Sequence, residues 1–186
     1  MRQQFTHDQF MALALEQASY GQFIARPNPA VGCVLVKDNK VVGAGFTQEA
    51  GGPHAEVMAM RAAGDLVVGS TVYVTLEPCS HYGRTPPCSL SLIEAGVSCL
   101  VYGCQDPNPQ VSGQGLAQLR AANVEVVGPV MQAECEMSNV GFLQRMGTHK
   151  PYVINKMAMS LDGRTAMESG ESQWITGSES RAQVHL

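Results

Sequence analysis

The chain has 186 residues, of which 45% are hydrophobic and 15% charged, and its formal net charge is -4. The length is enough for one well-buried domain and some additional residues. The composition argues against long disordered segments, and the negative charge argues against a broad nucleic-acid-binding surface. No apolar run reaches the roughly 18 residues of a membrane span, and the N-terminal residues lack the apolar core of a signal peptide. We therefore expect a cytoplasmic protein with neither a nucleic-acid nor a membrane partner. Its six cysteines are expected to be thiols or metal ligands rather than disulfides.

The first predicted element is a helix near the N-terminus. Thr6 and Gln9 have the spacing of a capping box, in which two side chains satisfy free backbone N–H groups at a helix start. The mostly apolar run 10–18 follows, so we expect a buried helix that ends near Gly21. The sequence Pro27-Asn28-Pro29 then predicts a loop.

Strands and helices alternate beyond this loop. The predicted strands cover residues 31–36, 41–46, 71–76, 98–102 and 124–127, the first two as a hairpin. The predicted helices cover residues 56–63, 88–95, 115–122 and 129–146. The alternation after residue 71 indicates parallel strands joined by helical crossovers. We therefore predict an α/β fold, a three-layer α/β/α sandwich around a mixed sheet of about five strands.

The segment 147–151 is the predicted domain boundary. Residues 152–159 form a further strand candidate, and Asp162-Gly163 predicts a tight turn. About 35 residues cannot build an independent α/β core. We therefore assign one domain to residues 1–147 and read residues 148–186 as an appendage or as the start of a second domain cut short.

A His-Ala-Glu sequence and two later cysteines form the most informative motif. His54, Cys79 and Cys88 can supply one imidazole and two thiolates to a zinc ion, which leaves a fourth position open for catalysis. This pattern is typical of zinc deaminases, in which activated water attacks an amino-bearing carbon of a nitrogenous base. Glu56 is then the group that moves protons. Because residues two apart on a helix point in different directions, His54 must lie at or before the first helical turn.

Other interpretations of the same residues remain open. Cys79 and Cys88 could be buried thiols, and a structural zinc site could recruit His81 as its fourth ligand. The remaining cysteines lie in apolar runs or on a predicted helix, so we expect them to be buried in the core or incidental. These are Cys33, Cys99, Cys104 and Cys135.

Four segments resemble the bifunctional deaminase–reductases of riboflavin biosynthesis, the RibD/RibG type. Eight residues separate the cysteines in TLEPCSHYGRTPPC, whereas cytidine and transfer-RNA deaminases usually have two. The segments PNPAVG and PHAEV are similar to the same family. So is KPYVINKMAMSLDGRTAMESGESQWITG, which resembles the opening of the family's reductase domain. The resemblance covers nearly the whole chain and implies a cytidine-deaminase-like fold.

The resemblance also implies a reaction and its cofactors. The expected substrate is 2,5-diamino-6-(5-phosphoribosylamino)pyrimidin-4(3H)-one, which loses its 2-amino group as ammonia to give 5-amino-6-(5-phosphoribosylamino)uracil. In the family a reductase domain then uses NADPH. By resemblance, Asn28 contacts the pyrimidine, and His81 and Arg84 lie in a loop placed to clamp the substrate, with Arg84 suited to the phosphate. Lys156, Ala158 and Trp174 match NADPH positions, and Ser172 matches a substrate position.

The sequence departs from the family at three places. Thr47 and Met58 stand where many members have histidines, so altered substrate contacts are expected there. The reductase region stops at Leu186, so no reduction is expected from this chain. Two other functions stay open: a nucleoside or transfer-RNA deaminase, and a non-catalytic zinc-stabilised module. Deaminases of this fold often associate, so a homo-oligomer is an open alternative.

Overall fold

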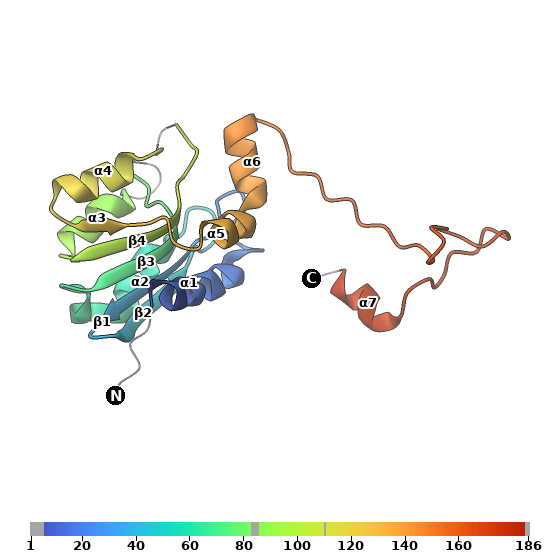
Figure 1. The fold of residues 1–186 in the computed structure, drawn as a ribbon, viewed down its shortest axis with the longest axis horizontal. Coiled ribbons are helices and arrows are strands. Elements are labelled where there is room, and N and C mark those ends of the chain that lie inside the picture. The colour runs from blue at the N-terminus through green and yellow to red at the C-terminus, as the bar shows by residue number, and fades with distance from the viewer. Residues whose placement is uncertain (1–5, 83–85, 110, 185–186) are drawn as a thin grey trace. The chain divides into compact units, whose positions relative to one another are not determined.

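The computed structural model describes residues 6–82, 86–109 and 111–184. The chain divides into two units, Met1–Tyr152 and Val153–Leu186. The first unit contains a five-stranded sheet and six α-helices, and the second contains one short helix (Figure 1). Among the described residues, no helix has the length and apolar character needed to cross a membrane.

The sheet of the first unit has the strand order β2-β1-β3-β4-β5. The strands are β1 (Gly32–Lys37), β2 (Lys40–Phe46), β3 (Thr71–Leu76), β4 (Cys99–Cys104) and β5 (Glu125–Val127). β1 pairs antiparallel with β2 and β3, whereas β4 runs parallel to β3 and β5. The helices are α1 (His7–Gly21), α2 (Ala55–Ala63), α3 (Cys88–Glu94), α4 (Gln114–Ala121), α5 (Gln132–Ser138) and α6 (Val140–Thr148). The predicted mixed sheet of about five strands is confirmed.

Local sequence explains the first elements. Thr6 and Gln9 form the predicted capping box at the start of α1, with Gln9 N–H donating to Thr6 Oγ1 at 3.3 Å. Asp38 and Asn39 both have positive φ angles, 50° and 59°, at the turn between β1 and β2. A two-residue hairpin turn with both residues in this conformation matches the twist of the flanking strands. The predicted hairpin is therefore confirmed.

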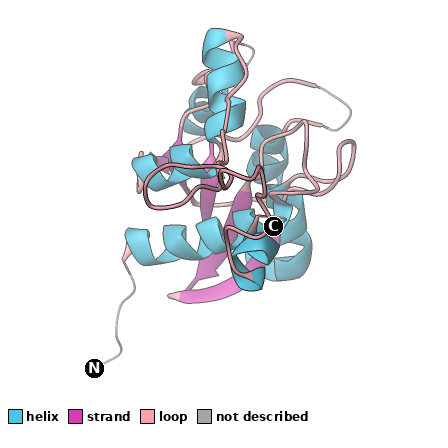
Figure 2. Ribbon diagram, turned by 90° about the vertical axis from the view of Figure 1, so that its right-hand side faces the viewer, coloured by secondary structure: helices cyan, strands magenta, loops and turns pink. Residues whose placement is uncertain are grey.

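Helices cover both faces of the sheet (Figures 1 and 2). A Cβ on Gly32 would lie 1.8 Å from Ala14 O of α1, and a Cβ on Gly45 would lie 2.7 Å from Ala59 N of α2. Gly45 pairs with Cys33, the neighbour of Gly32, and side chains alternate between faces along a strand. α1 and α2 therefore pack on opposite faces, each against a glycine that permits the close approach. α5 contacts α1, and α3 contacts α2 and α4, which completes three layers.

The core fills the spaces between these layers. Its largest fully buried side chains include Met11 of α1, Leu35 of β1, Leu92 of α3, Leu100 of β4 and Leu119 of α4. The four cysteines expected in the core are buried: Cys33, Cys99, Cys104 and Cys135.

The predicted helix 129–146 is wrong as a single element. The structure contains α5 and α6 instead, separated at Asn139, whose φ and ψ angles of -127° and 25° are not helical. The Asn139 side chain forms two hydrogen bonds with the backbone of Ala30. Sequence periodicity cannot reveal this break, because the partner lies 109 residues away in the chain.

The second unit differs from expectation at its start. Residues 152–159 are extended but form no strand in the described structure. A strand needs a neighbour to receive its backbone hydrogen bonds, and Val153 is 77% exposed here. The predicted turn at Asp162-Gly163 is present, with Gly163 N–H donating to Ser160 O at 2.9 Å. The unit ends with α7 (Ser178–Gln183), from which Arg181 stacks on the Trp174 ring at 4.1 Å.

Candidate active site

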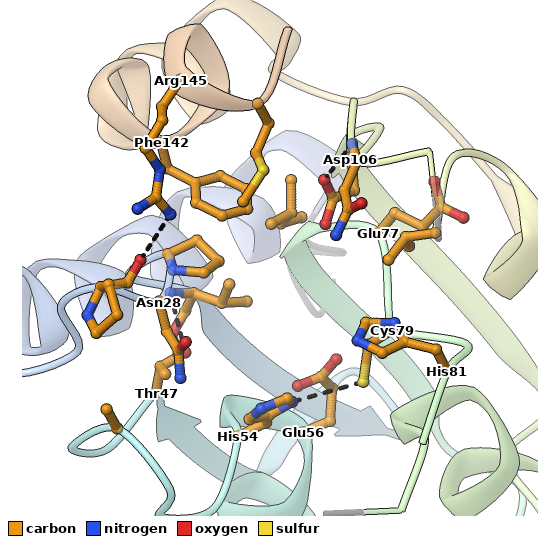
Figure 3. A pocket seen from close by; sticks show the side chains of 18 of the residues that line it. Asn28, Thr47, His54, Glu56, Glu77, Cys79, His81, Asp106, Phe142 and Arg145 are labelled. Carbon is orange, nitrogen blue, oxygen red and sulfur yellow. Dashed lines mark hydrogen bonds between the residues drawn. The ribbon is translucent and has the colours of Figure 1, made fainter. Parts of the chain in front are cut away.

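A cavity of about 490 Å³ opens in the first unit beside the start of α2 (Figure 3). Its walls come from the 27–31 loop, the end of β2, the start of α2, the end of β3, the 106–111 loop and α6. Residues from 27 to 146 therefore meet at one site. The residues that carry its chemistry are Asn28, Thr47, His54, Glu56, Glu77, Cys79, His81, Asp106, Phe142 and Arg145.

Three potential metal ligands converge at one end of this cavity. One ligand atom each from His54, Cys79 and Cys88 lies within 4.8 Å of the other two. The Nδ1 atom of His54 is 3.3 Å from Cys88 Sγ and 3.6 Å from Cys79 Sγ. His81, the alternative fourth ligand of a structural site, lines the cavity but is not part of this cluster. Three protein ligands leave a position open, as catalytic zinc sites do.

Two helix starts place these ligands. His54 has extended backbone angles, φ -75° and ψ 166°, and directly precedes α2. The two-residue spacing of His54 and Glu56 predicts this position, because it lets both side chains face the same point. Cys88 is the first residue of α3, and its backbone N–H donates to Cys79 Sγ at 3.3 Å. The end of β3 leads directly to Cys79, so both cysteines lie at a strand-to-helix connection.

The electrostatics of the cluster favour a thiolate. Hydrogen bonds from Cys88 and then from His54 hold the pKa of Cys79 well below its usual range. The hydrogen bond with Cys79 is in turn the main cause that raises the pKa of His54. In an imidazolium–thiolate pair the imidazolium carries the proton. A divalent cation would displace that proton, because metal ligands must be deprotonated. The donor set of one nitrogen and two sulfurs fits zinc.

Glu56 is buried beside the cluster. Only 4% of the residue is exposed, and it lines the cavity. Burial and then the negative charge of Cys79 raise the pKa of Glu56 to about 7. A carboxyl group with a pKa near neutrality can both accept and return a proton. Glu56 therefore has the position and the proton affinity of a general acid–base group.

The residues predicted to contact substrate are only partly brought together. Asn28 and His81 both line the cavity, Asn28 on the far side from Cys79 (Figure 3). Thr47 also lines it, but its hydroxyl is already bonded to the backbone of Val31. Arg84, predicted to bind phosphate, lies outside the described residues.

Three charged residues of the cavity wall were not predicted from the sequence. Glu77 accepts hydrogen bonds from the backbone N–H groups of Gly113 and Gly115 at 2.9 and 3.1 Å. Asp106 lies on the wall near Glu77, and burial raises the pKa of each carboxyl. Arg145 reaches the cavity from α6. Glu77, two residues before Cys79, was visible in the TLEPC motif, whereas nothing local marks Arg145.

The four residues matched to the reductase lie in the second unit. Lys156 and Ala158 belong to the extended segment that follows residue 151, and Ser172 and Trp174 to a stretch of turns. Trp174 packs against Arg181 and is 68% exposed. The roles of these four residues toward NADPH and the reductase substrate stay predictions.

Comparison with known families defines the class of this chain. The profile of the cytidine and deoxycytidylate deaminase zinc-binding region matches residues 4–104, and that of the RibD C-terminal domain matches residues 151–186. The chain therefore belongs to the cytidine and deoxycytidylate deaminase family. The matched region includes the His/Cys/Cys cluster, so the prediction of a zinc site is confirmed.

Particular relatives are riboflavin biosynthesis proteins, and the resemblance to the RibD/RibG type is confirmed. RibD of Escherichia coli is 56% identical over 95% of this chain and 48% of its own length. The solved structure of Acinetobacter baumannii RibD has a TM-score of 0.90 at 52% identity, covering 96% of this chain and 50% of its own. A Thermotoga maritima structure, named as a diaminohydroxyphosphoribosylaminopyrimidine deaminase and 5-amino-6-(5-phosphoribosylamino)uracil reductase, has a TM-score of 0.91 at 42% identity, covering 96% and 52%. The chain spans about half the length of these relatives.

Proposed function

We propose that this chain hydrolytically deaminates 2,5-diamino-6-(5-phosphoribosylamino)pyrimidin-4(3H)-one, releasing ammonia and 5-amino-6-(5-phosphoribosylamino)uracil. The observation that carries the proposal is the convergence of His54, Cys79 and Cys88 beside the buried Glu56 at the end of a cavity. The names of the RibD relatives support the choice of substrate. The eight residues between Cys79 and Cys88 argue against a nucleoside or transfer-RNA substrate.

Different residues of the site would bind the metal, transfer protons and bind the substrate. A zinc ion held by His54, Cys79 and Cys88 would supply a Lewis acid that activates water at neutral pH. Glu56 takes one proton from the attacking water and delivers it to the ring nitrogen. It then takes the second proton from the newly added oxygen and delivers it to the departing amine, which leaves as ammonia. Its burial excludes bulk water that would compete for that proton. Asn28, on the opposite wall, has an amide that can bond to the edge of the pyrimidine.

We further propose a domain division at residue 147, with the deaminase domain in residues 1–147 and the start of a reductase domain in 148–186. The separate profile match to residues 151–186 and the break between units at 152 and 153 support it. In that second part, Lys156, Ala158 and Trp174 would contact NADPH. Ser172 would contact the reductase substrate.

Ammonia release by the zinc-loaded chain tests the proposed reaction. The diaminopyrimidine ribotide is the substrate, and Glu56→Ala is measured in parallel. We expect release from the wild type, and a loss of roughly 10²–10⁴-fold in the variant because the proton carrier is gone. Both proteins should hold one zinc per chain, since Glu56 is not one of the proposed ligands.

Three results would contradict the proposal in different ways. No release from a zinc-loaded wild type, together with release from cytidine or from adenosine-containing RNA, would assign a different substrate. Equal rates from the wild type and from Glu56→Ala would remove Glu56 from the reaction. No release from any of these substrates would favour a zinc-stabilised module without catalysis.

A further inference from the structure

Arg145 occupies a distinct part of the cavity wall. Among the described residues, it is the only arginine or lysine that lines the cavity. It extends from α6 on the opposite side from His54 and Glu56, and near Asn28 (Figure 3). The only permanent positive charge on the described wall is therefore separated from the metal cluster by the open space of the cavity.

The guanidinium group of Arg145 is held in place by two contacts. Its Nη2 donates to the Pro27 carbonyl at 3.2 Å, and its carbon lies 5.9 Å from the centre of the Phe142 ring. A guanidinium has five N–H donors in a rigid plane, and in the described part of the chain this group makes one hydrogen bond. The geometry leaves donors for a ligand while restricting where the plane can point.

Positively and negatively charged side chains lie on different walls of the cavity. Glu77 and Asp106 lie on a different wall from Arg145, and Glu56 lies beside the metal cluster (Figure 3). A dianionic group would be repelled by these carboxylates and attracted by Arg145, which is suited to bidentate recognition of phosphate. A ligand with a polar ring and a distant phosphate therefore has one favourable orientation. Its ring points to the metal cluster and its phosphate to α6.

We propose that Arg145 binds the phosphate of the substrate and thereby sets which end of it enters the cavity. This proposal rests on the proposed function, because that function supplies a ligand with a phosphoribosyl group. It assigns Arg145 a role that the sequence analysis gave to Arg84.

The test compares Arg145→Gln with the wild type on two substrates, the diaminopyrimidine ribotide and the same riboside without phosphate. We expect KM for the ribotide to rise about ten- to a hundredfold, as for a lost hydrogen bond to a charged group. KM for the riboside should change less than about twofold, because that substrate lacks the group that Arg145 contacts. Arg145→Lys, which keeps the charge and loses the planar fork, should lie between the two.

Two further variants make the test specific. Arg120→Gln removes an exposed arginine of α4 that does not line the cavity, and it should leave both KM values unchanged. Arg84→Gln is measured on the same pair of substrates. A phosphate-dependent loss in Arg84→Gln without one in Arg145→Gln would overturn the proposal. So would an equal loss on the ribotide and the riboside in Arg145→Gln.

Binding of ribose 5-phosphate separates this proposal from the proposed reaction. Calorimetry should detect binding to the wild type, and binding should be weakened at least tenfold in Arg145→Gln. If the wild type releases no ammonia yet this difference is observed, the proposed reaction fails and the phosphate site stands. If ammonia is released but ribose 5-phosphate binds both proteins equally, or neither, the phosphate site is wrong.

Discussion

The two sides of the cavity are built in different ways. On the metal side, His54 and Glu56 are two residues apart, and Cys79 and Cys88 are joined by one short connection. On the α6 side, contacts such as Arg145 to Pro27 span 118 residues of the chain. The first side is set by local backbone geometry at two helix starts. The second exists only after the helices after β5 have packed near the 27–31 loop.

This difference assigns separate tasks to the two sides. The metal side holds the groups that we propose bind zinc and move protons, and the ligand atoms of His54, Cys79 and Cys88 lie within 4.8 Å of one another. The α6 side holds Asn28 and Arg145, which we propose contact the substrate. Changes on the metal side should therefore remove zinc or turnover, whereas changes on the α6 side should raise KM and leave zinc in place.

The largest expected effect is that of Cys79→Ser on the metal side. A hydroxyl does not replace a thiolate as a zinc ligand, so we expect zinc to fall well below one per chain after dialysis and ammonia release to be lost. Cys99→Ser is the matched control, because Cys99 is buried in β4 and does not line the cavity. Metal content measured by mass spectrometry decides the outcome. Full zinc occupancy in Cys79→Ser would mean that the metal side has been assigned wrongly.

The next effect concerns Glu77, whose hydrogen bonds connect the metal side to Gly113 and Gly115 at the start of α4. In Glu77→Gln an NH2 group replaces one of the two carboxylate oxygens. That group faces the backbone N–H of Gly113 or Gly115 and cannot accept its hydrogen bond. Because the carboxylate is buried, we expect the free energy of unfolding to fall by about 3 kcal/mol. Urea denaturation measures this loss. Glu125→Gln, at an exposed position of β5, should change it by less than about 0.5 kcal/mol.

The sequence predicted the metal side more completely than the α6 side, for a physical reason. Strand and helix patterns place His54, Glu56 and Cys88 at helix starts, and the structure has them there. The break at Asn139 depends on a distant partner.

The strand predicted for residues 152–159 failed for a related reason. Its apolar residues have the composition of a strand, but pairing requires a neighbour that local composition does not specify. Neither the absence of this strand nor the break at Asn139 can therefore be read from local sequence, because each depends on what lies beside it in space.

A smaller effect is expected from Asn139→Ala on the α6 side. Its amide both donates to Ala30 O at 2.9 Å and accepts from Ala30 N–H at 2.8 Å, and so fixes the loop that carries Asn28. Losing both bonds leaves buried backbone groups unpaired, so we expect about 2 kcal/mol less stability. KM should also rise, with one zinc per chain retained.

Hydrogen exchange provides a structural measure of the same change. The amide of Ala30 should exchange faster in Asn139→Ala, because its acceptor is gone. Asn139→Asp keeps an acceptor for that amide but cannot donate to Ala30 O, so it should protect the amide without restoring full stability. Gln132→Ala, an exposed position on α5, is the control. A loss of zinc in Asn139→Ala with KM unchanged would contradict the expectation that changes on the α6 side raise KM and leave zinc in place.

The smallest effect is expected at Thr47, which lies between the two sides at the end of β2. Its hydroxyl accepts from Val31 N–H at 3.1 Å and lies 3.4 Å from Val31 O, so it serves the backbone although it lines the cavity. Thr47→Val keeps the shape and removes these bonds, and we expect about 1 kcal/mol less stability with KM changed less than about twofold. Thr148→Val at the exposed end of α6 is the control. A larger rise in KM would show that the Thr47 hydroxyl contacts substrate. The residues that contact substrate would then include one at the end of β2 as well as those of the α6 side.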